Sequence, residues 1–245
     1  MMNLWDSRCW GIACINQIEN LTKIQPRSSL AKVHGWNGLM GMSLTFRHGE
    51  DIDQREAGVS ILQKYWKAFA PRDVYEWSQR IANSGGYVIA AYVGNAIAGI
   101  LEAIRLDIGG DPHQVPATFQ KLTGDGTWRT HKDSGDTVLL VDLTIAPDYQ
   151  GAGLFEDLAL YAQRTFKSPS GVILTYSPLF LAKKKYWVVH KHERLGGKLT
   201  RELRRSRPGL TMTVGGEELS AEDVGIMSYV QNPMDHETNG SICSQ

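Results

Sequence analysis

The most informative segment of the sequence is Val141–Leu154, which reads Val-Asp-Leu-Thr-Ile-Ala-Pro-Asp-Tyr-Gln-Gly-Ala-Gly-Leu. Its apolar and β-branched first half predicts a buried strand, and Pro147 ends that strand. Gly151 and Gly153 then lead directly into a segment with apolar residues at helical spacing, which predicts a helix to about Phe166. A strand followed by a glycine turn and a helix is an arrangement that can present backbone amides to a ligand.

The chemistry of such a turn favours a phosphate ligand. Glycines let the backbone come close to a bulky anion. The first turn of a helix carries unpaired N–H groups and a dipole equivalent to roughly half a positive charge, so it binds a diphosphate without a lysine. The pattern is neither Gly-x-Gly-x-x-Gly nor Gly-x-x-x-x-Gly-Lys, which argues against the dinucleotide-binding and P-loop readings. An ordinary strand-to-helix turn remains the alternative.

The order Leu-x-Ile-x-Pro-x-Tyr-Gln-Gly-x-Gly-Leu at 143–154 resembles the acetyl-CoA motif of the GNAT acyltransferases. The resemblance covers roughly residues 43–230 in element order and is specific only in this motif. It implies acetyl-CoA or another acyl-CoA as cosubstrate, with its pyrophosphate on the backbone amides of Gln150, Gly151, Ala152, Gly153, Leu154 and Phe155. It also implies that Leu143, Thr144 and Ile145 pair with the pantetheine arm and hold the thioester carbonyl. Phe155 stands where the family has a small residue.

The rest of the chain predicts an α/β fold with a GNAT-like mixed, mostly antiparallel sheet flanked by helices. Gly94-Asn95 gives the two-residue turn of a hairpin between apolar runs. Helical spacing after Glu50 predicts one helix, and Pro71 is expected to open a second. The predicted strands are 43–48, 87–93, 96–106, 137–145, 172–176, 198–203 and 224–230. We expect an N-terminal extension over 1–42, the acyltransferase domain over 43–232 and a polar tail over 233–245.

Composition narrows the partners. The chain has 245 residues, of which 42% are hydrophobic, and 26 basic residues balance 26 acidic ones. A net charge of zero gives no field that recruits nucleic acid or a membrane. The three cysteines lack metal-ligand spacing, so no metal site is expected. We see no signal peptide and no apolar run of membrane-spanning length, which predicts a cytoplasmic protein.

His192 is the first candidate for catalysis. GNAT chains usually continue with Phe-Tyr-x-x-x-Gly-Phe, whose tyrosine often protonates the departing thiolate. The matching stretch here is Lys-His-Glu-Arg-Leu-Gly-Gly at 191–197, so the resemblance places His192 at the tyrosine position. An imidazole titrates near pH 6.5 and can give or take a proton near neutrality. A solvated histidine on a charged helix is the alternative.

A second resemblance concerns three residues together. Thr175-Tyr-Ser-Pro, then His192, then Arg207-Pro is similar to a GNAT subgroup of polyketide assembly lines, which decarboxylates malonyl-CoA and passes acetyl to a carrier-protein thiol. This resemblance implies that Thr175 and His192 bond the developing enolate. Arg207 would grip the malonyl carboxylate in a bidentate pair. A strand-end hydroxyl and a surface charge are the structural alternatives for Thr175 and Arg207.

Several weaker candidates accompany these residues. Asp142 and Glu102 lie on predicted strands and could act as a general base, although structural pairing is the commoner fate of such acids. The polar stretch 107–136 is long for a loop, so residues 126–131 could shape the acceptor pocket with His131 as a second base. The basic run at 183–207 could form the rim of a 3′-phosphate site or a dock for an acidic carrier protein, or simply a solvated face.

These observations leave three functional hypotheses. The first is acyl transfer from an acyl-CoA to a small-molecule amine by direct attack. The second keeps the fold but decarboxylates malonyl-CoA and loads an acyl carrier protein. The third is a GNAT-like module that senses acyl-CoA without turnover, which the substitution at Phe155 and the missing tyrosine favour.

Overall fold

The computed structural model describes residues 43–179, 187–214 and 217–231, and the expected extension 1–42 and tail 233–245 lie outside them. The described chain forms a seven-stranded sheet in the order β1-β2-β3-β4-β5-β9-β6. Only β4 and β5 pair in parallel, so the predicted mixed and mostly antiparallel sheet is confirmed. The strands are β1 Leu44–His48, β2 Val88–Val93, β3 Ala96–Leu106, β4 Thr137–Ile145, β5 Val172–Leu179, β6 Lys198–Leu203 and β9 Asp223–Val230.

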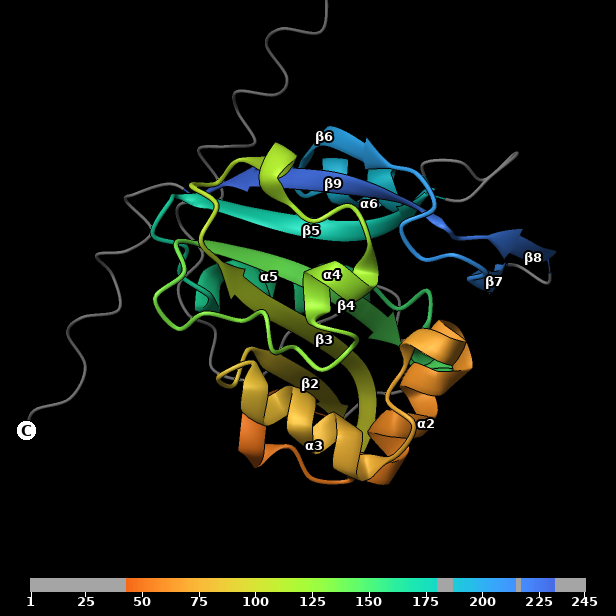
Figure 1. The fold of residues 1–245 in the computed structure, drawn as a ribbon. Coiled ribbons are helices and arrows are strands. Elements are labelled where there is room, and N and C mark those ends of the chain that lie inside the picture. The colour runs from red at the N-terminus through yellow and green to blue at the C-terminus, as the bar shows by residue number, and fades with distance from the viewer. Residues whose placement is uncertain (1–42, 180–186, 215–216, 232–245) are drawn as a thin grey trace, which may run out of the picture. The chain divides into compact units, whose positions relative to one another are not determined.

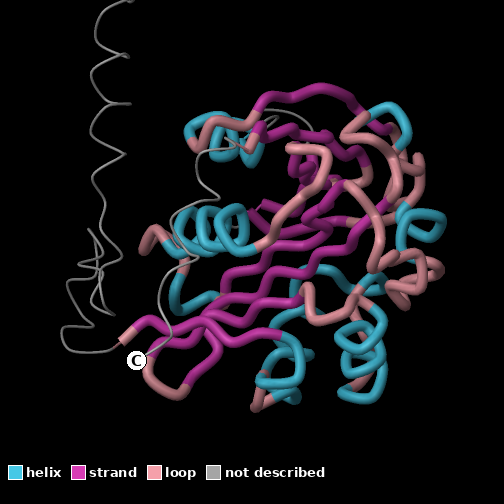
Figure 2. The backbone as a smooth tube through the Cα atoms, turned by 90° about the vertical axis from the view of Figure 1, so that its left-hand side faces the viewer, coloured by secondary structure: helices cyan, strands magenta, loops and turns pink. Residues whose placement is uncertain are grey.

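Helices cover both faces of this sheet. They are α2 Arg55–Trp66, α3 Val74–Asn83, α4 Phe119–Thr123, α5 Leu154–Thr165 and α6 Trp187–Arg194. In Figure 1, α3 and α4 lie in front of the strands and α5 and α6 lie behind them. Figure 2 shows the sheet nearly edge-on, with helices on its two sides. The two layers of helices explain why most of the central strand residues are buried.

The period-two alternation of the strands divides the core into two clusters. Ala90 and Tyr92 of β2 share a cluster with Trp77 of α3, whereas Ile89 packs in the other cluster with Leu158 of α5. Successive side chains on a strand point to opposite faces, so one strand supplies both clusters. Each large apolar side chain buried in this way contributes about 1.5–3 kcal/mol to folding. The two clusters hold β4 and α5 in place, and these two elements carry the residues of the candidate site described below.

The second helix starts later than the sequence predicts. Pro71 was expected to open it, but α3 begins at Val74, and the side chain of Asp73 accepts a hydrogen bond from the backbone N–H of Glu76 at 2.9 Å. The Asp73 carboxylate pairs with the backbone amide of the third helical residue, which a proline side chain cannot do. The expectation for Pro71 was therefore wrong by three residues, and the cap decides the boundary.

A small hairpin was not predicted. β7 (Thr211–Val214) and β8 (Glu217–Ser220) form a separate two-stranded sheet, which lies beside the end of α2. The Lys67 ammonium donates to the Thr211 hydroxyl at 2.6 Å and contacts the Glu218 carboxylate at 3.1 Å. The available signal in the sequence was Gly-Gly directly after the β-type run Thr-Met-Thr-Val.

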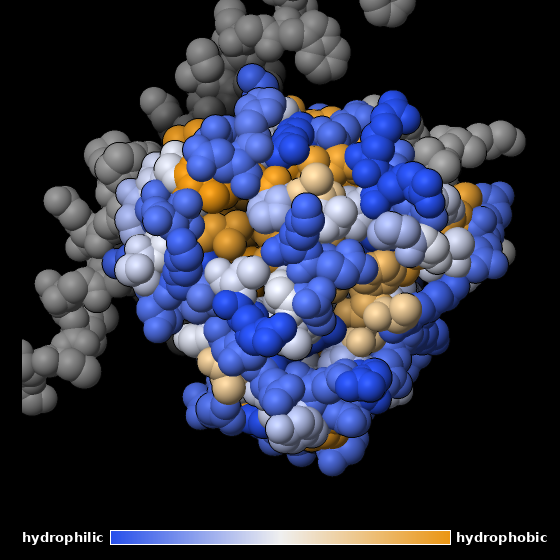
Figure 3. Space-filling model, in the orientation of Figure 1, coloured by the Kyte–Doolittle hydropathy of each residue, from blue (hydrophilic) through white to orange (hydrophobic). Residues whose placement is uncertain are grey.

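The polar stretch 107–136 belongs to the folded core. Val115, Phe119, Leu122 and Trp128 are all buried in the cluster that contains α3. Figure 3 shows this face of the molecule, where hydrophilic side chains leave only patches of apolar surface. The segment therefore covers one face of the sheet. None of the described helices is long and apolar enough to cross a membrane.

Candidate functional site

The site begins where two parallel strands separate. The register of β4 and β5 runs only from Val138 opposite Ile173 to Leu140 opposite Thr175, although both strands continue further. Beyond that point a cavity of about 550 Å³ lies between them, lined by residues of both strands. Backbone that leaves its neighbour has groups to offer a ligand, because buried N–H and C=O groups need partners. The divergence therefore creates a slot in which β4 no longer pairs with β5 beyond Leu140.

The glycine turn closes one end of this cavity. A 3-10 helix over Pro147–Tyr149 leads to Gly151 and Gly153, whose φ angles are 80° and 85°. α5 starts at Leu154, and no side chain caps it at Gly153. A Cβ built on Gly151 meets nothing within 4 Å, so this glycine answers a conformational need and leaves open space beside the backbone. Gly153 supplies no capping side chain, so the start of α5 can present its first backbone amides to an anion.

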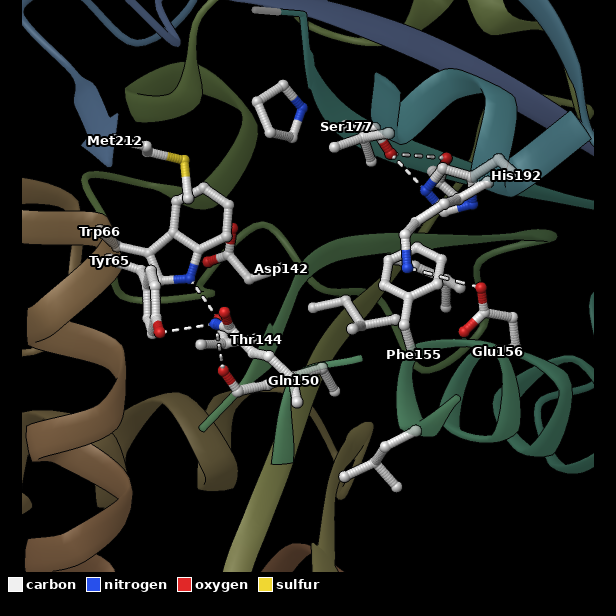
Figure 4. A pocket seen from close by; sticks show the side chains of 18 of the residues that line it. Tyr65, Trp66, Asp142, Thr144, Gln150, Phe155, Glu156, Ser177, His192 and Met212 are labelled. Atoms are coloured by element: carbon white, nitrogen blue, oxygen red, sulfur yellow. Dashed lines mark hydrogen bonds and ion pairs between the residues drawn. The ribbon is translucent and has the colours of Figure 1, made fainter. Parts of the chain in front are cut away.

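Hydrogen bonds fix the wall opposite this helix. The Gln150 amide donates to the Tyr65 hydroxyl at 2.6 Å and to the Ile145 carbonyl at 3.2 Å. The indole N–H of Trp66 donates to the Thr144 hydroxyl at 2.6 Å. Figure 4 shows these side chains facing Phe155 and His192 across the cavity. Of the residues predicted to bind the cosubstrate, all except Ala152 line the cavity.

On the far wall, four side chains form a continuous hydrogen-bonded chain. The hydroxyls of Thr175 and Ser177, two residues apart on β5, lie 3.2 Å from each other. Ser177 Oγ lies 2.7 Å from His192 Nε2 (Figure 4), and His192 Nδ1 lies 2.5 Å from the Tyr229 hydroxyl. Thr175, Ser177 and His192 line the cavity, so the structure brings two predicted residues together through one that was not predicted.

His192 is buried, with only 4% of its surface exposed, so the alternative of a solvated histidine is wrong. The Phe155 ring packs against the imidazole at 5.2 Å between centroids, edge to face. Burial, with a smaller contribution from the positive charge of Lys191, lowers the pKa of His192 to about 4. The ring is therefore neutral at pH 7. It can donate or accept a hydrogen bond there, but it does not carry a positive charge.

The two candidate carboxylates are each paired with a buried arginine. The Arg207 guanidinium, with none of its surface exposed, donates to Asp142 at 2.5 Å and lies over the Trp66 ring at 4.3 Å. Glu102 accepts from Trp77 at 3.0 Å and pairs with Arg80 at 3.4 Å. Desolvation, partly offset by Arg80, raises the pKa of Glu102 to about 7. Asp142 lines the cavity, whereas Arg207 and Glu102 lie behind its walls.

The position of Arg207 bears on its expected role. It is not a surface charge, so that alternative is wrong. Its Nη2 already serves Asp142 and the Val141 carbonyl, while Nη1 and Nε find no partner among the described residues. A substrate carboxylate at this guanidinium would meet Asp142 as a like charge. Arg207 therefore lies behind the cavity wall and holds the Asp142 carboxylate, which lines the cavity.

The remaining candidates are spread over the fold. His131 lies outside the cavity lining and accepts from the Arg105 amide at 3.0 Å. In the basic run, Lys183, Lys184 and Lys185 lie outside the described residues, and Arg201 donates to the carbonyls of Pro112, His113 and Val115. Among the described residues, no three His, Cys, Asp or Glu side chains gather closely enough to hold a metal ion.

Sequence reasoning missed several residues of the site, among them Trp66, Ser177, Met212 and Tyr229. Ser177 was within reach, because it stands two residues from Thr175 on the same strand and therefore on the same face. Tyr229 had no local signal, since it contacts His192 from a strand 37 residues further along the chain. Met212 belongs to the hairpin that was not predicted.

Comparisons with known proteins agree with this architecture. No protein-family model and no curated protein matches the sequence. Among solved structures, the loading GNATL domain of CurA from Lyngbya majuscula is similar over 76% of this chain and 97% of its own, with 16% identity and a TM-score of 0.58. The GphF GNAT-like decarboxylase, in complex with isobutyryl-CoA, is similar over 76% of this chain and 98% of its own, with 17% identity and a TM-score of 0.55. The described chain therefore has the fold of the GNAT acyltransferases.

Proposed function

We propose that this protein binds an acyl-CoA in the slot between β4 and β5 and transfers its acyl group. The observation that carries the proposal is the meeting of two features at one cavity: the diverging strands, and a start of α5 at which Gly153 gives no capping side chain. The diverging strands suit the amides of a pantetheine arm, and the start of α5 suits a diphosphate. A cavity of about 550 Å³ with mostly apolar walls falls in the usual range for ligand pockets.

The residues of the turn fit the cosubstrate. Backbone amides from Gly151 to Phe155 would hold the diphosphate, because the helix dipole and the unpaired N–H groups act there together. Two acids follow in the first turn, but Glu156 lies 3.5 Å from both Lys191 and Arg194, which offset its charge. Leu143 and its neighbours would then guide the pantetheine arm. The acyl-CoA supplies a reactive thioester, and the chain must place that group near the far wall.

The far wall offers donors to the thioester. Thr175 and Ser177 present hydroxyls, and the neutral imidazole of His192 stands behind them. Donors that are already in place where negative charge develops on the carbonyl oxygen usually give the largest catalytic effect, often 10²–10³-fold for each donor. The wall is therefore suited to an oxyanion or an enolate. This supports an enzyme over a module that only senses acyl-CoA.

The acceptor decides between the two enzymatic hypotheses. A small-molecule amine must lose a proton, yet both carboxylates that line the cavity, Asp142 and Glu156, have cationic partners. His192 is a weak base because burial lowers its pKa to about 4. Donors without a ready base fit the second hypothesis better. Loss of CO2 from a malonyl thioester leaves an enolate, which those donors stabilise until its carbon takes a proton. Acetyl then passes from CoA to a carrier thiol, and the departing CoA thiolate takes up the proton that the thiol loses.

One experiment separates the hypotheses. The protein is incubated with malonyl-CoA, and acetyl-CoA is followed by mass spectrometry, with Thr175→Val as the variant that loses the donor. Parallel samples contain acetyl-CoA with a panel of amines, and thiol release is measured. We expect decarboxylation that Thr175→Val lowers about 10²-fold. Thiol release with an amine and no decarboxylation would favour the amine acceptor. Binding in calorimetry without either reaction would favour the sensor.

A further inference from the structure

Two side chains with no assigned role, Ser177 and Tyr229, contact opposite nitrogens of the His192 ring. Ser177 Oγ lies 2.7 Å from Nε2, and the Tyr229 hydroxyl lies 2.5 Å from Nδ1. A neutral imidazole carries its proton on one nitrogen and accepts with the other. If Tyr229 donates to Nδ1, the ring proton lies on Nε2, and Nε2 is then the donor towards the cavity. The question is where the Tyr229 proton goes.

Tyr229 has two acceptors within reach, and one of them is already used. The His192 carbonyl lies 3.4 Å from the Tyr229 hydroxyl. That oxygen also accepts from the backbone amides of Leu195 at 3.0 Å and Gly197 at 2.9 Å. A carbonyl oxygen has two lone pairs, and the two shorter bonds take both. Burial raises the pKa of Tyr229, so the phenol keeps its proton. Nδ1, which is nearer, is the acceptor that remains.

The direction of the remaining bonds follows. With Nδ1 accepting, the neutral ring carries its proton on Nε2 and donates to Ser177 Oγ. The Ser177 proton is then free for Thr175, 3.2 Å away, or for a ligand in the cavity that both residues line. Every bond in this chain points from the protein interior towards the cavity. Bonds that point the same way polarise one another, which strengthens the last donor.

We propose that Ser177 donates a hydrogen bond to the carbonyl oxygen of the bound thioester, and that Tyr229 is a positioning residue that holds His192 as the Nε2–H tautomer. The role of Ser177 rests on the proposed function of the cavity. The role of Tyr229 rests on the geometry of the ring alone. We therefore assign the contact with the thioester to Ser177. His192, which stands at the position of the family's tyrosine, acts on the thioester only through the Ser177 hydroxyl.

The surroundings of Tyr229 support a fixed ring. A Cβ at Gly197 would lie 2.7 Å from Tyr229 Cζ and 2.9 Å from Tyr229 Cε1, which is closer than real side chains approach one another. Gly197 therefore has to be a glycine where this tyrosine packs. On the other side of His192, the Phe155 ring packs edge to face against the imidazole. The tyrosine, the glycine and the phenylalanine leave the histidine one orientation.

The first test reads the tautomer without any reaction. The protein is labelled with ¹⁵N-histidine, and His192 is assigned among the seven histidines by its loss in His192→Gln. We expect a protonated Nε2 and an unprotonated Nδ1 in the wild type, and a mixture of tautomers in Tyr229→Phe. Tyr161→Phe is the matched control, because its hydroxyl contacts His48 Nε2 at 3.0 Å outside the cavity. A wild-type ring protonated on Nδ1, or an unchanged tautomer in Tyr229→Phe, overturns the role of Tyr229.

The second test reads the donor. Acetyl-CoA labelled with ¹³C at the carbonyl is bound without an acceptor, and its carbonyl resonance is recorded by NMR. We expect a shift to higher frequency on binding that Ser177→Ala largely abolishes, whereas Ser60→Ala on the exposed side of α2 keeps it. An equal shift in Ser177→Ala overturns the role of Ser177. If acetyl-CoA does not bind, the proposed function and the Ser177 role both fail, and the tautomer result still stands on its own.

Discussion

The two ends of the cavity are built in opposite ways. The phosphate end consists of consecutive backbone amides, and its shape comes from Gly151 and Gly153 within a few residues of chain. The far wall consists of side chains from three elements, with Ser177 on β5, His192 on α6 and Tyr229 on β9. A site made of local backbone can be recognised from a motif. A site made of side chains from distant segments exists only once the fold brings them together.

The difference between the two ends predicts separate effects of mutation. Binding should depend mainly on the glycine turn, and turnover should depend mainly on the hydroxyls and the imidazole. A change at one end that acts like a change at the other would show that the two ends are not separate.

The largest effect is expected from His192→Ala. Removing the imidazole leaves Ser177 without its donor and opens a buried space, so turnover should fall about 10²-fold or more. Binding of CoA, measured by calorimetry, should stay within about three-fold, because the imidazole is not among the groups expected to hold the diphosphate. Near-normal turnover in a folded variant would remove His192 from the mechanism.

A smaller effect, on binding alone, is expected from a charge in the turn. Gly151 has a φ of 80° and open space at its Cβ position, and both asparagine and aspartate tolerate such a backbone. Gly151→Asp should weaken CoA binding about ten-fold more than Gly151→Asn, since only the aspartate repels a diphosphate at close range. Equal affinities of the two variants would place the diphosphate elsewhere.

Phe155 offers a way to link the two ends. Its ring stands at the start of α5 and also covers His192 at 5.2 Å. Phe155→Ala should admit water to the imidazole and raise its pKa from about 4 towards its ordinary value. An NMR titration of the His192 ring measures this change. Phe46→Ala, which removes a ring stacked on Tyr161, is the control and should leave the titration unchanged. A rise of equal size in both variants would contradict the shielding role.

The smallest effect concerns stability and pH. The folded-state pKa of His192 is about 4 and the unfolded value is about 6.5, so the unfolded chain binds the extra proton in this window. This group therefore destabilises the fold as the pH falls from 6.5 to 4, by at most about 1.4 kcal/mol per pH unit. Glu102, whose pKa is raised to about 7, has the opposite effect on the pH dependence of stability. Because Glu102 is present in both the wild type and His192→Gln, its effect cancels when the two are compared. Urea unfolding of His192→Gln should show less loss of stability on acidification than the wild type. An identical pH dependence would contradict the buried neutral ring.

The sequence predicted the fold well because its signals are local. Pro147 and the two glycines after β4, the Gly94-Asn95 hairpin and the period-two runs all act within a few residues. The β7–β8 hairpin was missed because four-residue strands carry little periodicity. The start of α3 was misplaced because Pro71 and Asp73 are both helix-start signals, and only a side-chain cap distinguishes them.

The site was predicted in part, for the same physical reason. The turn residues and Thr175 could be found from their neighbours in the chain. The partners of His192 and the Asp142–Arg207 pair could not, because each joins residues tens of positions apart. The burial of His192 also depends on Phe155 and Tyr229, so its neutral state could not be read from a segment full of charges.

The most direct test of the central claim is a crystal structure of the protein with CoA bound. The account predicts the diphosphate on the backbone amides between Gly151 and Phe155, with the pantetheine arm between β4 and β5 and the sulfur near Thr175 and Ser177. A turn capped by its own side chains, with CoA bound at another surface, would contradict it.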